Sequence, residues 1–336
     1  MNVSIILSTY NRADKLDLTL SNFCKLDHRE IEAEYIVVNN NSSDNTASVV
    51  QRYQDQLPIV YLEEPIPGKN NAMNRALDSC EMGDVIVFTD DDICPQPSWL
   101  QNICASIQAY PDFDVFGGKV SMIWPDDAPQ WARELEFIVY PQHDLGDESI
   151  PYPERRTPIG PNFWVRKNVF ENGRRFDNTF GPKPNANRRI MGNETSFLFG
   201  LLDEGKKIRY CPECHIGHYL SEDQLTVPYV IQRARTHGRF FARLGRSFPK
   251  RSLYERNPFA WRAIRRLSLL RHLLNYGIRA ALPNSPRNIK SRVLIQREIS
   301  FNIECLMYSD EIFEYQSSRA VTPLKPIKLK QPTHKS

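Results

Sequence analysis

The sequence predicts an α/β fold in which a mostly parallel sheet is flanked by helices and followed by a helical extension toward the C-terminus. In residues 1–120, short β-branched or aromatic runs alternate with stretches of helical spacing, which is the pattern of βαβ units. Several of these runs end on polar residues, as strands do where their carboxyl ends form one edge of a sheet. From Glu222 onward the chain has helical spacing for most of its length.

The elements of the first 120 residues follow one another through short turns. The predicted strands are Val3–Ser8, Tyr35–Val38, Ile59–Tyr61, Asp84–Thr89 and Asp114–Val120. The predicted helices are Arg12–Leu26, a segment from Ser43 or Asp44 to about Gln54, Asn70–Cys80 and Trp99–Ala109. Because a helix follows most of the strands, we expect mostly parallel neighbours in the sheet.

Later segments alternate between irregular and regular structure. Six prolines interrupt residues 121–158, which we expect to form an irregular excursion over the active face. Regular structure is expected again at Ile159–Val165, in a helix from Gly192 to near Gly205, and in strand-like runs at Lys207–Tyr210 and His215–Leu220. The helices beyond Glu222 are broken at Pro249, Pro258, Pro283 and Pro286, and the tail beyond about Ser318 is expected to be disordered.

Bulk composition is that of a globular chain with a basic C-terminal third. The 336 residues are 41% hydrophobic and 25% charged, and a net charge of +3 gives no reason to expect a nucleic-acid partner. Arginines crowd from Arg233 to Arg271, which suggests an anionic partner, either a phosphate-bearing substrate or a membrane surface. Residues 261–282 mix leucines with arginines. Such a basic amphipathic helix either lies on an anionic membrane or packs against the catalytic domain or a second subunit.

Targeting and cysteine patterns point to the cytoplasm. No basic and apolar leader opens the sequence, and no segment approaches the ~20 apolar residues of a membrane-spanning helix. The seven cysteines are scattered and odd in number, which fits reduced thiols better than a disulfide framework. We therefore expect a cytoplasmic protein, with peripheral contact at the inner face of the membrane as a further expectation.

Three consecutive carboxylates, Asp90, Asp91 and Asp92, end the strand that begins near Asp84. Three acids in a row repel one another unless a cation sits among them, and hard oxygen ligands suit Mg²⁺ or Mn²⁺. A solvated acidic loop is the alternative. The position at the carboxyl end of a strand favours a binding site, because ligands of open α/β sheets bind there.

Other polar residues fall at the same predicted edge. Thr9, Asn11 and Arg12 follow the first strand, and Arg12 begins a helix, where backbone N–H groups also favour phosphate. Asn39 follows the second strand, and the nearby Asp44 either accepts hydrogen bonds from a base or ribose or caps the next helix. Lys69 follows a Pro-Gly turn and either contacts a bound phosphate or is solvated.

Several other motifs narrow the chemistry. The sequence lacks a Gly-x-Gly-x-x-Gly dinucleotide fingerprint, a P-loop and a nucleophile elbow. The segment Cys211–His218 holds two cysteines and two histidines, but zinc ribbons need a second ligand pair elsewhere. His218 alone is either a ligand at a strand end or an ordinary core or surface histidine. Glu194, in the first turn of a helix, is either a general base or a common helix-start glutamate.

Together these segments resemble family 2 glycosyltransferases of the GT-A fold. The motifs that carry the resemblance are Val3–Arg12, Tyr35–Thr46, Phe88–Asp92 with Pro95 and Trp99–Leu100, Gly160–Lys167 and Gly192–Phe197. The resemblance covers about residues 1–245 and implies a GT-A catalytic domain with a Rossmann-like sheet. Residues 246–318 would then form a basic helical extension and residues 319–336 a disordered tail.

The resemblance implies a metal-dependent, inverting transfer of a sugar from a nucleotide-diphosphate sugar to the hydroxyl of a glycan or lipid-linked acceptor. A UDP-sugar is expected first, with GDP- and dTDP-sugars as alternatives, and Mn²⁺ or Mg²⁺ as the cofactor. In matching positions, Asp90, Asp92 and His218 would hold the metal and Glu194 would be the base, although Asn193-Glu194 stands where the family usually has an acidic pair. The residues expected to bind the donor are Thr9, Asn11, Arg12, Asn39, Asp44, Lys69, Asp90 and Asp91.

Two other functions remain open on the sequence. A sugar-phosphate nucleotidyltransferase would also place acids and a metal at the edge of such a sheet, but it would not need Glu194 as a base. A non-catalytic protein that binds sugars or a membrane surface could use the same fold.

Overall fold

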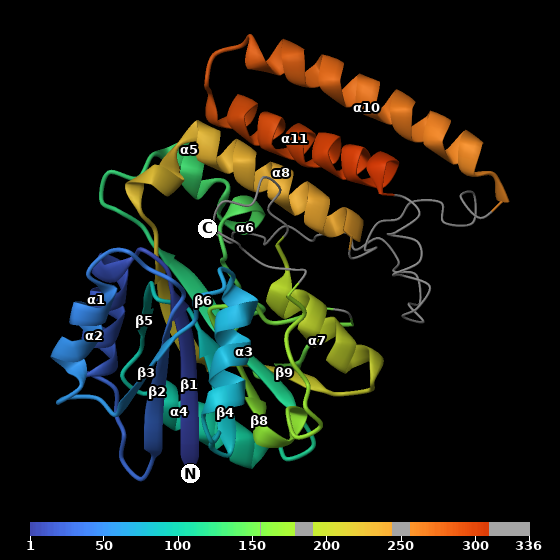
Figure 1. The fold of residues 1–336 in the computed structure, drawn as a ribbon. Coiled ribbons are helices and arrows are strands. Elements are labelled where there is room, and N and C mark those ends of the chain that lie inside the picture. Colours follow the sequence, from blue (N-terminus) through green and yellow to red (C-terminus); the bar gives the residue numbers. More distant parts are fainter. Residues whose placement is uncertain (155, 179–190, 244–255, 309–336) are drawn as a thin grey trace.

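The computed structural model describes residues 1–154, 156–178, 191–243 and 256–308, and Figure 1 shows a twisted sheet with helices packed around it. The strands are β1 Asn2–Thr9, β2 Glu32–Asn39, β3 Ile59–Glu63, β4 Val85–Thr89, β5 Ile93–Pro95, β6 Val115–Ile123, β7 Ile150–Pro151, β8 Asn162–Arg166 and β9 Ile208–Tyr219. The α-helices are α1 Ala13–Phe23, α2 Thr46–Tyr53, α3 Lys69–Ser79, α4 Trp99–Ala109, α5 Gln130–Arg133, α6 Glu136–Val139, α7 Asn193–Asp203, α8 Val227–Arg243, α10 Pro258–Ala280 and α11 Pro286–Met307. Two 3₁₀ turns are η1 Lys167–Val169 and η2 Glu222–Leu225.

The first half of the sheet is parallel, in the order β3-β2-β1-β4. Helices α1, α2 and α3 connect or follow these strands, so the predicted α/β fold is confirmed. Parallel pairing places the carboxyl ends of β1, β2 and β4 at one edge, as predicted.

The second half of the sheet departs from the simple βαβ order. β8 lies between β4 and β6 and runs antiparallel to both, with Val87 opposite Trp164. A continued series of βαβ units would have placed the run that begins near Asp114 next to β4. In the structure β8 separates the two strands. β4 pairs instead with β8, a strand from much later in the chain.

The prediction of two separate strand-like runs after residue 206 is wrong, because β9 covers both of them. It is one strand, parallel to β6, but the pairing shifts: Gly118 lies opposite Cys211 and Val120 opposite Ile216. The extra residues on β9 form a bulge that contains Pro212, a residue without an N–H to donate to the ladder. Residues 121–158 form the end of β6 and the short elements α5, α6 and β7, instead of a wholly irregular segment.

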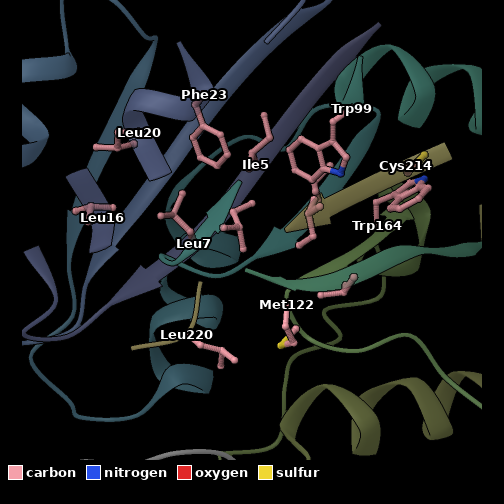
Figure 2. Packing of buried hydrophobic residues seen from close by; sticks show 14 of the residues in the cluster. Ile5, Leu7, Leu16, Leu20, Phe23, Trp99, Met122, Trp164, Cys214 and Leu220 are labelled. Carbon is pink, nitrogen blue, oxygen red and sulfur yellow. The ribbon is translucent and has the colours of Figure 1, made fainter. Parts of the chain in front are cut away.

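Alternate residues of β1 point into two apolar layers. Ile5 and Leu7 pack with helices α1 and α4, where Figure 2 shows Leu16, Phe23 and Trp99 around them. Ile6 belongs to the layer on the opposite face of the sheet, with apolar residues of α3 and α7. Burial on both faces explains why the central strands are continuous apolar runs in the sequence.

The C-terminal helices form a stack beyond the sheet, in which α8 packs on α11 and α11 on α10 (Figure 1). At Gly238 of α8, an added Cβ would lie 2.2 Å from the carbonyl oxygen of Arg297, so glycine permits this close approach. Pro258 and Pro286 stand at the first positions of α10 and α11, where a missing N–H costs nothing, so the predicted breaks there are helix starts. Pro249, the boundary at residue 245 and the predicted disordered tail lie outside the described residues.

No helix within the described ranges is long and apolar enough to cross a membrane.

Candidate active site

Seven of the predicted site residues meet at the carboxyl edge of the sheet. They come from the β1–α1 turn, the start of α3, the end of β4, the start of α7 and the end of β9. The residues are Arg12, Lys69, Asp90, Asp91, Asp92, Glu194 and His218. Apart from Arg12, all have side chains less than a quarter exposed, so their charges interact in a partly desolvated site.

Arg12 binds two of the three aspartates. Its Nη1 lies 2.8 Å from Asp91 Oδ1, and its Nη2 donates to Asp92 Oδ2. Burial raises the pKa of the Asp91 carboxyl, and the guanidinium of Arg12 opposes that shift. Arg12 therefore neutralises the acids on one side, at the residue that precedes the first turn of α1.

Asp90, Asp92 and His218 form the one cluster of three metal-ligand side chains found in the described part of the chain. Their ligand atoms lie within 4.8 Å of one another. His218 Nε2 is 3.2 Å from Asp92 Oδ1 and 3.8 Å from Asp90 Oδ2. Burial would lower the pKa of His218, but the two carboxylates outweigh it and raise that pKa.

This cluster fits a divalent cation. Asp92 Oδ1 is buried, and its one close polar neighbour among the described residues is His218 Nε2, itself a candidate metal ligand, at 3.2 Å. Two carboxylates with one imidazole suit Mn²⁺ and, with water in the remaining positions, Mg²⁺. Such a cation would replace the repulsion between the carboxylates with attraction.

Lys69 joins the acidic cluster to Glu194. Its Nζ donates to Asp90 Oδ1 at 2.5 Å and to Glu194 Oε1 at 2.7 Å. Burial alone would lower the pKa of Lys69, but the two carboxylates raise it well above its usual value. The same ammonium group lowers the pKa of Asp90 against the opposing effect of burial. Lys69 was expected at a bound phosphate. In this structure it spans two carboxylates.

Asn40 holds the turn that carries Lys69, a role that sequence reasoning missed. Asn40 Oδ1 accepts from the N–H of Gly68 at 2.7 Å, and its Nδ2 donates to the carbonyls of Glu64 and Ile66. The residue is 3% exposed. The run of three asparagines after a predicted strand was the available signal, but the local sequence does not indicate which of the three faces the next turn.

Glu194 sits in the first turn of α7, after Gly192, which has the left-handed φ of 91°. An added Cβ at Gly160 would lie 2.4 Å from Glu194 Oε1, so glycine leaves room for the carboxylate there. An added Cβ at Gly192 would collide with the ring of Phe240 on α8. Both glycines therefore shape the position of Glu194, which their place in the sequence motifs did not reveal.

The other predicted donor-binding residues tie neighbouring loops together. Asn11 Oδ1 accepts from the N–H of Ser43 at 2.7 Å, and Asn39 bonds Tyr61 and Ser42. Asp44 accepts from the N–H groups of Ala13 and Thr46, so it serves the starts of both α1 and α2.

Asp44 and Thr9 both lie in this loop region. Burial opposes ionisation of Asp44, but the hydrogen bonds that the Asp44 carboxylate accepts outweigh burial and lower its pKa. Thr9 is buried at the end of β1. Asp44 thus bonds the first N–H group of each helix, but the N-cap position of α2 is Asn45, and the Asp44 carboxylate lies at the same edge as the acidic cluster.

The two histidines of the Cys211–His218 segment face different surroundings. His215 hydrogen-bonds Ser121 at 2.7 Å and Gln96 at 3.1 Å, away from the acidic cluster. Burial lowers the pKa of His215, whereas the pKa of His218 is raised. Residues three apart on a strand point to opposite faces, which is why only His218 reaches Asp90 and Asp92.

Comparison with known proteins agrees with these features. The model of the family described as "Glycosyl transferase family 2" matches residues 4–174. The succinoglycan biosynthesis protein ExoM of Rhizobium meliloti (strain 1021) is 25% identical over 251 residues, which cover 72% of this chain and 76% of that protein.

Two solved structures share the fold. The mannosyltransferase PcManGT from Pyrobaculum calidifontis, in complex with GDP-Man and Mn²⁺, has a TM-score of 0.56 at 19% identity, covering 92% of this chain and 87% of that one. S. aureus TarS 1-349, in complex with UDP-GlcNAc, has a TM-score of 0.51 at 18% identity, covering 90% of this chain and 92% of that one. At such identities the likeness concerns the fold.

Proposed function

The chain belongs to glycosyl transferase family 2, and from that premise we propose that it transfers a sugar, with inversion, from a nucleotide-diphosphate sugar to an acceptor hydroxyl. The observation that carries the proposal is the arrangement at the sheet edge. Asp90, Asp92 and His218 form a cluster whose ligand atoms could hold a divalent cation, and Lys69 links that cluster to the carboxylate of Glu194. A leaving-group site and a base therefore lie on two sides of one ammonium group.

The metal cluster would receive the diphosphate of the donor. A cation held by Asp90, Asp92 and His218 supplies positive charge for the diphosphate that leaves as the sugar is transferred. Either Mn²⁺ or Mg²⁺ suits the ligands, and the mannosyltransferase with the similar fold is described with Mn²⁺. Arg12 keeps Asp91 and Asp92 in place, and the N-terminus of α1 beside it favours phosphate.

Glu194 is the proposed general base. A single in-line displacement inverts the configuration at the anomeric carbon, and it requires a carboxylate that takes the proton of the acceptor hydroxyl. Lys69 is a positioning residue in this proposal, because its ammonium group donates to the Glu194 carboxylate and orients it. Thr9, Asn11, Asn39 and Asp44 would shape the neighbouring nucleotide-binding loops.

The donor is proposed to be a UDP-sugar, with GDP- and dTDP-sugars as alternatives. The acceptor would be a glycan or a lipid-linked sugar, in polysaccharide or glycolipid biosynthesis, as the name of the ExoM relative supports. We propose residues 1–245 as the catalytic domain and 246–318 as a basic extension. A cytoplasmic location fits the free state of all seven cysteines.

Product analysis tests this function. The full chain is incubated with a panel of nucleotide sugars, Mn²⁺ and candidate acceptors, and the released nucleotide is identified. We expect release of nucleoside diphosphate that stops when a chelator is added. Release of pyrophosphate would instead identify a nucleotidyltransferase, and release that persists in excess chelator would remove the metal from the proposal.

A further inference from the structure

The outward side of α10 gathers most of the exposed apolar side chains in the described part of the chain. Thirteen large hydrophobic residues are exposed there, and eight of them lie between residues 259 and 282. Seven of them belong to α10, namely Phe259, Ile264, Leu267, Leu270, Leu273, Leu274 and Ile278, and Leu282 lies just beyond its last residue, Ala280. We call this set the outer α10 face. Such a concentration on one helix marks an interaction site, whereas single exposed hydrophobics are ordinary.

The opposite side of α10 is already packed. Trp261 is 1% exposed and belongs to a small apolar cluster with Phe301 and Cys305 of α11. Figure 1 shows α10 as the outermost helix, on the far side of α11 from α8. Packing against the rest of the chain therefore accounts for one side of the helix, and it leaves Leu267 and Leu274 more than 65% exposed.

The charge around the outer α10 face has one sign. Residues 256–297 contain nine arginines, one lysine and no aspartate or glutamate. Arg266 and Arg271 are exposed on α10 itself, beside the apolar side chains. A surface that combines an apolar stripe with cations and no acids complements an apolar surface that carries negative charge.

A phospholipid bilayer with anionic headgroups has both properties. A second copy of the chain would bring its own arginines against these arginines without an acid from residues 256–297 to offset them. The helix is also too polar to span a membrane, and no described helix can do so. An amphipathic helix of this composition lies in the plane of the interface, with its apolar side chains among the acyl chains.

We propose that the outer α10 face docks the protein on the anionic surface of a phospholipid bilayer. The bilayer takes up Leu267, Leu270 and Leu274, while Arg266 and Arg271 bind lipid phosphates. In Figure 1 the stack of α8, α11 and α10 lies on the side of the sheet where the parallel strands end, so docking also brings the bilayer to the side that carries the candidate site. This inference stands on α10 alone and is independent of the reaction.

Vesicle co-sedimentation of the full chain tests the proposal. We expect binding to phosphatidylcholine vesicles that contain roughly 30% of the anionic lipid phosphatidylglycerol. We expect little binding to vesicles of phosphatidylcholine alone. The double variant Leu267→Glu with Leu274→Glu should weaken binding at least ~10-fold, because it places charge in the buried stripe. Arg266→Ala with Arg271→Ala should weaken it by roughly 30-fold, since each cation near such a surface contributes about 1 kcal/mol.

Controls separate docking from misfolding and from self-association. Leu18→Glu alters an exposed leucine of α1 and should leave vesicle binding unchanged. All of these variants replace exposed residues. If Leu267→Glu with Leu274→Glu lowers the melting temperature, Arg266→Ala with Arg271→Ala still tests the proposal. Equal binding to neutral vesicles, or unchanged binding by the arginine pair, would overturn the proposal. So would light scattering that shows a dimer which Leu267→Glu with Leu274→Glu separates.

Discussion

The end of β4 and the outer side of α10 both carry many charged residues, but the charges are paired at β4 and unpaired by acids on α10. At the end of β4, each buried or half-buried carboxylate has a cationic neighbour: Arg12 for Asp91 and Asp92, and Lys69 for Asp90. On α10, exposed arginines stand beside exposed leucines, and residues 256–297 hold no acid. In our proposals, the paired charges at β4 serve a small ligand, and the exposed charges of one sign on α10 serve an extended surface.

Energetics follow from this difference. A buried ion that loses its partner costs several kcal/mol, whereas an exposed ion costs little either way. Substitutions at the β4 site should therefore alter stability or turnover strongly, and substitutions of α10 arginines should leave both nearly unchanged away from a membrane.

The largest effect is expected from Glu194→Gln. Removal of a general base should reduce turnover by roughly 10²–10⁴-fold while donor affinity stays nearly the same. Steady-state rates and calorimetric titration with donor measure the two quantities. Glu204→Gln, at the other end of α7, is the matched control and should keep full turnover. Near-normal turnover of Glu194→Gln would move the base elsewhere.

Lys69→Met compares the two regions directly. Loss of the ammonium group leaves Asp90 and Glu194 without their shared cation, which should cost about 3 kcal/mol in the free energy of unfolding. Arg271→Met, on exposed α10, should change it by less than ~0.5 kcal/mol. Urea denaturation gives both values. Similar changes in the free energy of unfolding for the two variants would show that paired and unpaired charges do not differ in their contribution to stability.

Gly160→Ala probes how closely Glu194 is held. The added methyl group would press on the Glu194 carboxylate and displace it from Lys69, so turnover should fall by roughly 10-fold. Gly200→Ala, in α7 with open space around it, should keep turnover and raise stability by up to ~1 kcal/mol. Equal turnover of the two variants would show that the carboxylate position is not critical.

The smallest effect concerns His143, a half-buried base that is kept neutral. Burial, with help from Arg156, lowers its pKa to about 4, below the ~6.5 of an unfolded histidine. Its contribution to stability is complete above pH 6.5 and is lost as pH falls toward about 4, because only the unfolded state takes up the proton. Between pH 7 and 5.5 the wild type should lose about 1 kcal/mol that His143→Gln keeps. Parallel losses in both would contradict this assignment.

Much of the first half of the fold could be predicted because local pattern determines it. Val85–Thr89 and Trp99–Ala109 have continuous apolar or helical spacing, and the structure follows them closely. The position of β8 could not be predicted, since its pairing with β4 joins residues about 80 apart in sequence and leaves no local trace.

The candidate site divides in the same way. That the acids and Arg12 share one edge follows from strand direction, whereas the place of His218 beside them follows from the family resemblance. The link from Lys69 to Glu194 joins residues separated by 125 positions, and it depends on how the start of α7 is placed against the start of α3. The amphipathic pattern of residues 261–282 was visible, but only the packing of Trp261 shows which side stays exposed.

One measurement tests the central claim that Asp92 and its neighbours hold a metal for a nucleotide-sugar donor. Calorimetric titration of the full chain with UDP-sugar is performed with Mn²⁺ and with excess chelator. The wild type and the surface control Asp55→Ala should bind only with Mn²⁺, and Asp92→Ala should show no metal-dependent binding. Unchanged, Mn²⁺-dependent affinity in Asp92→Ala would contradict the account.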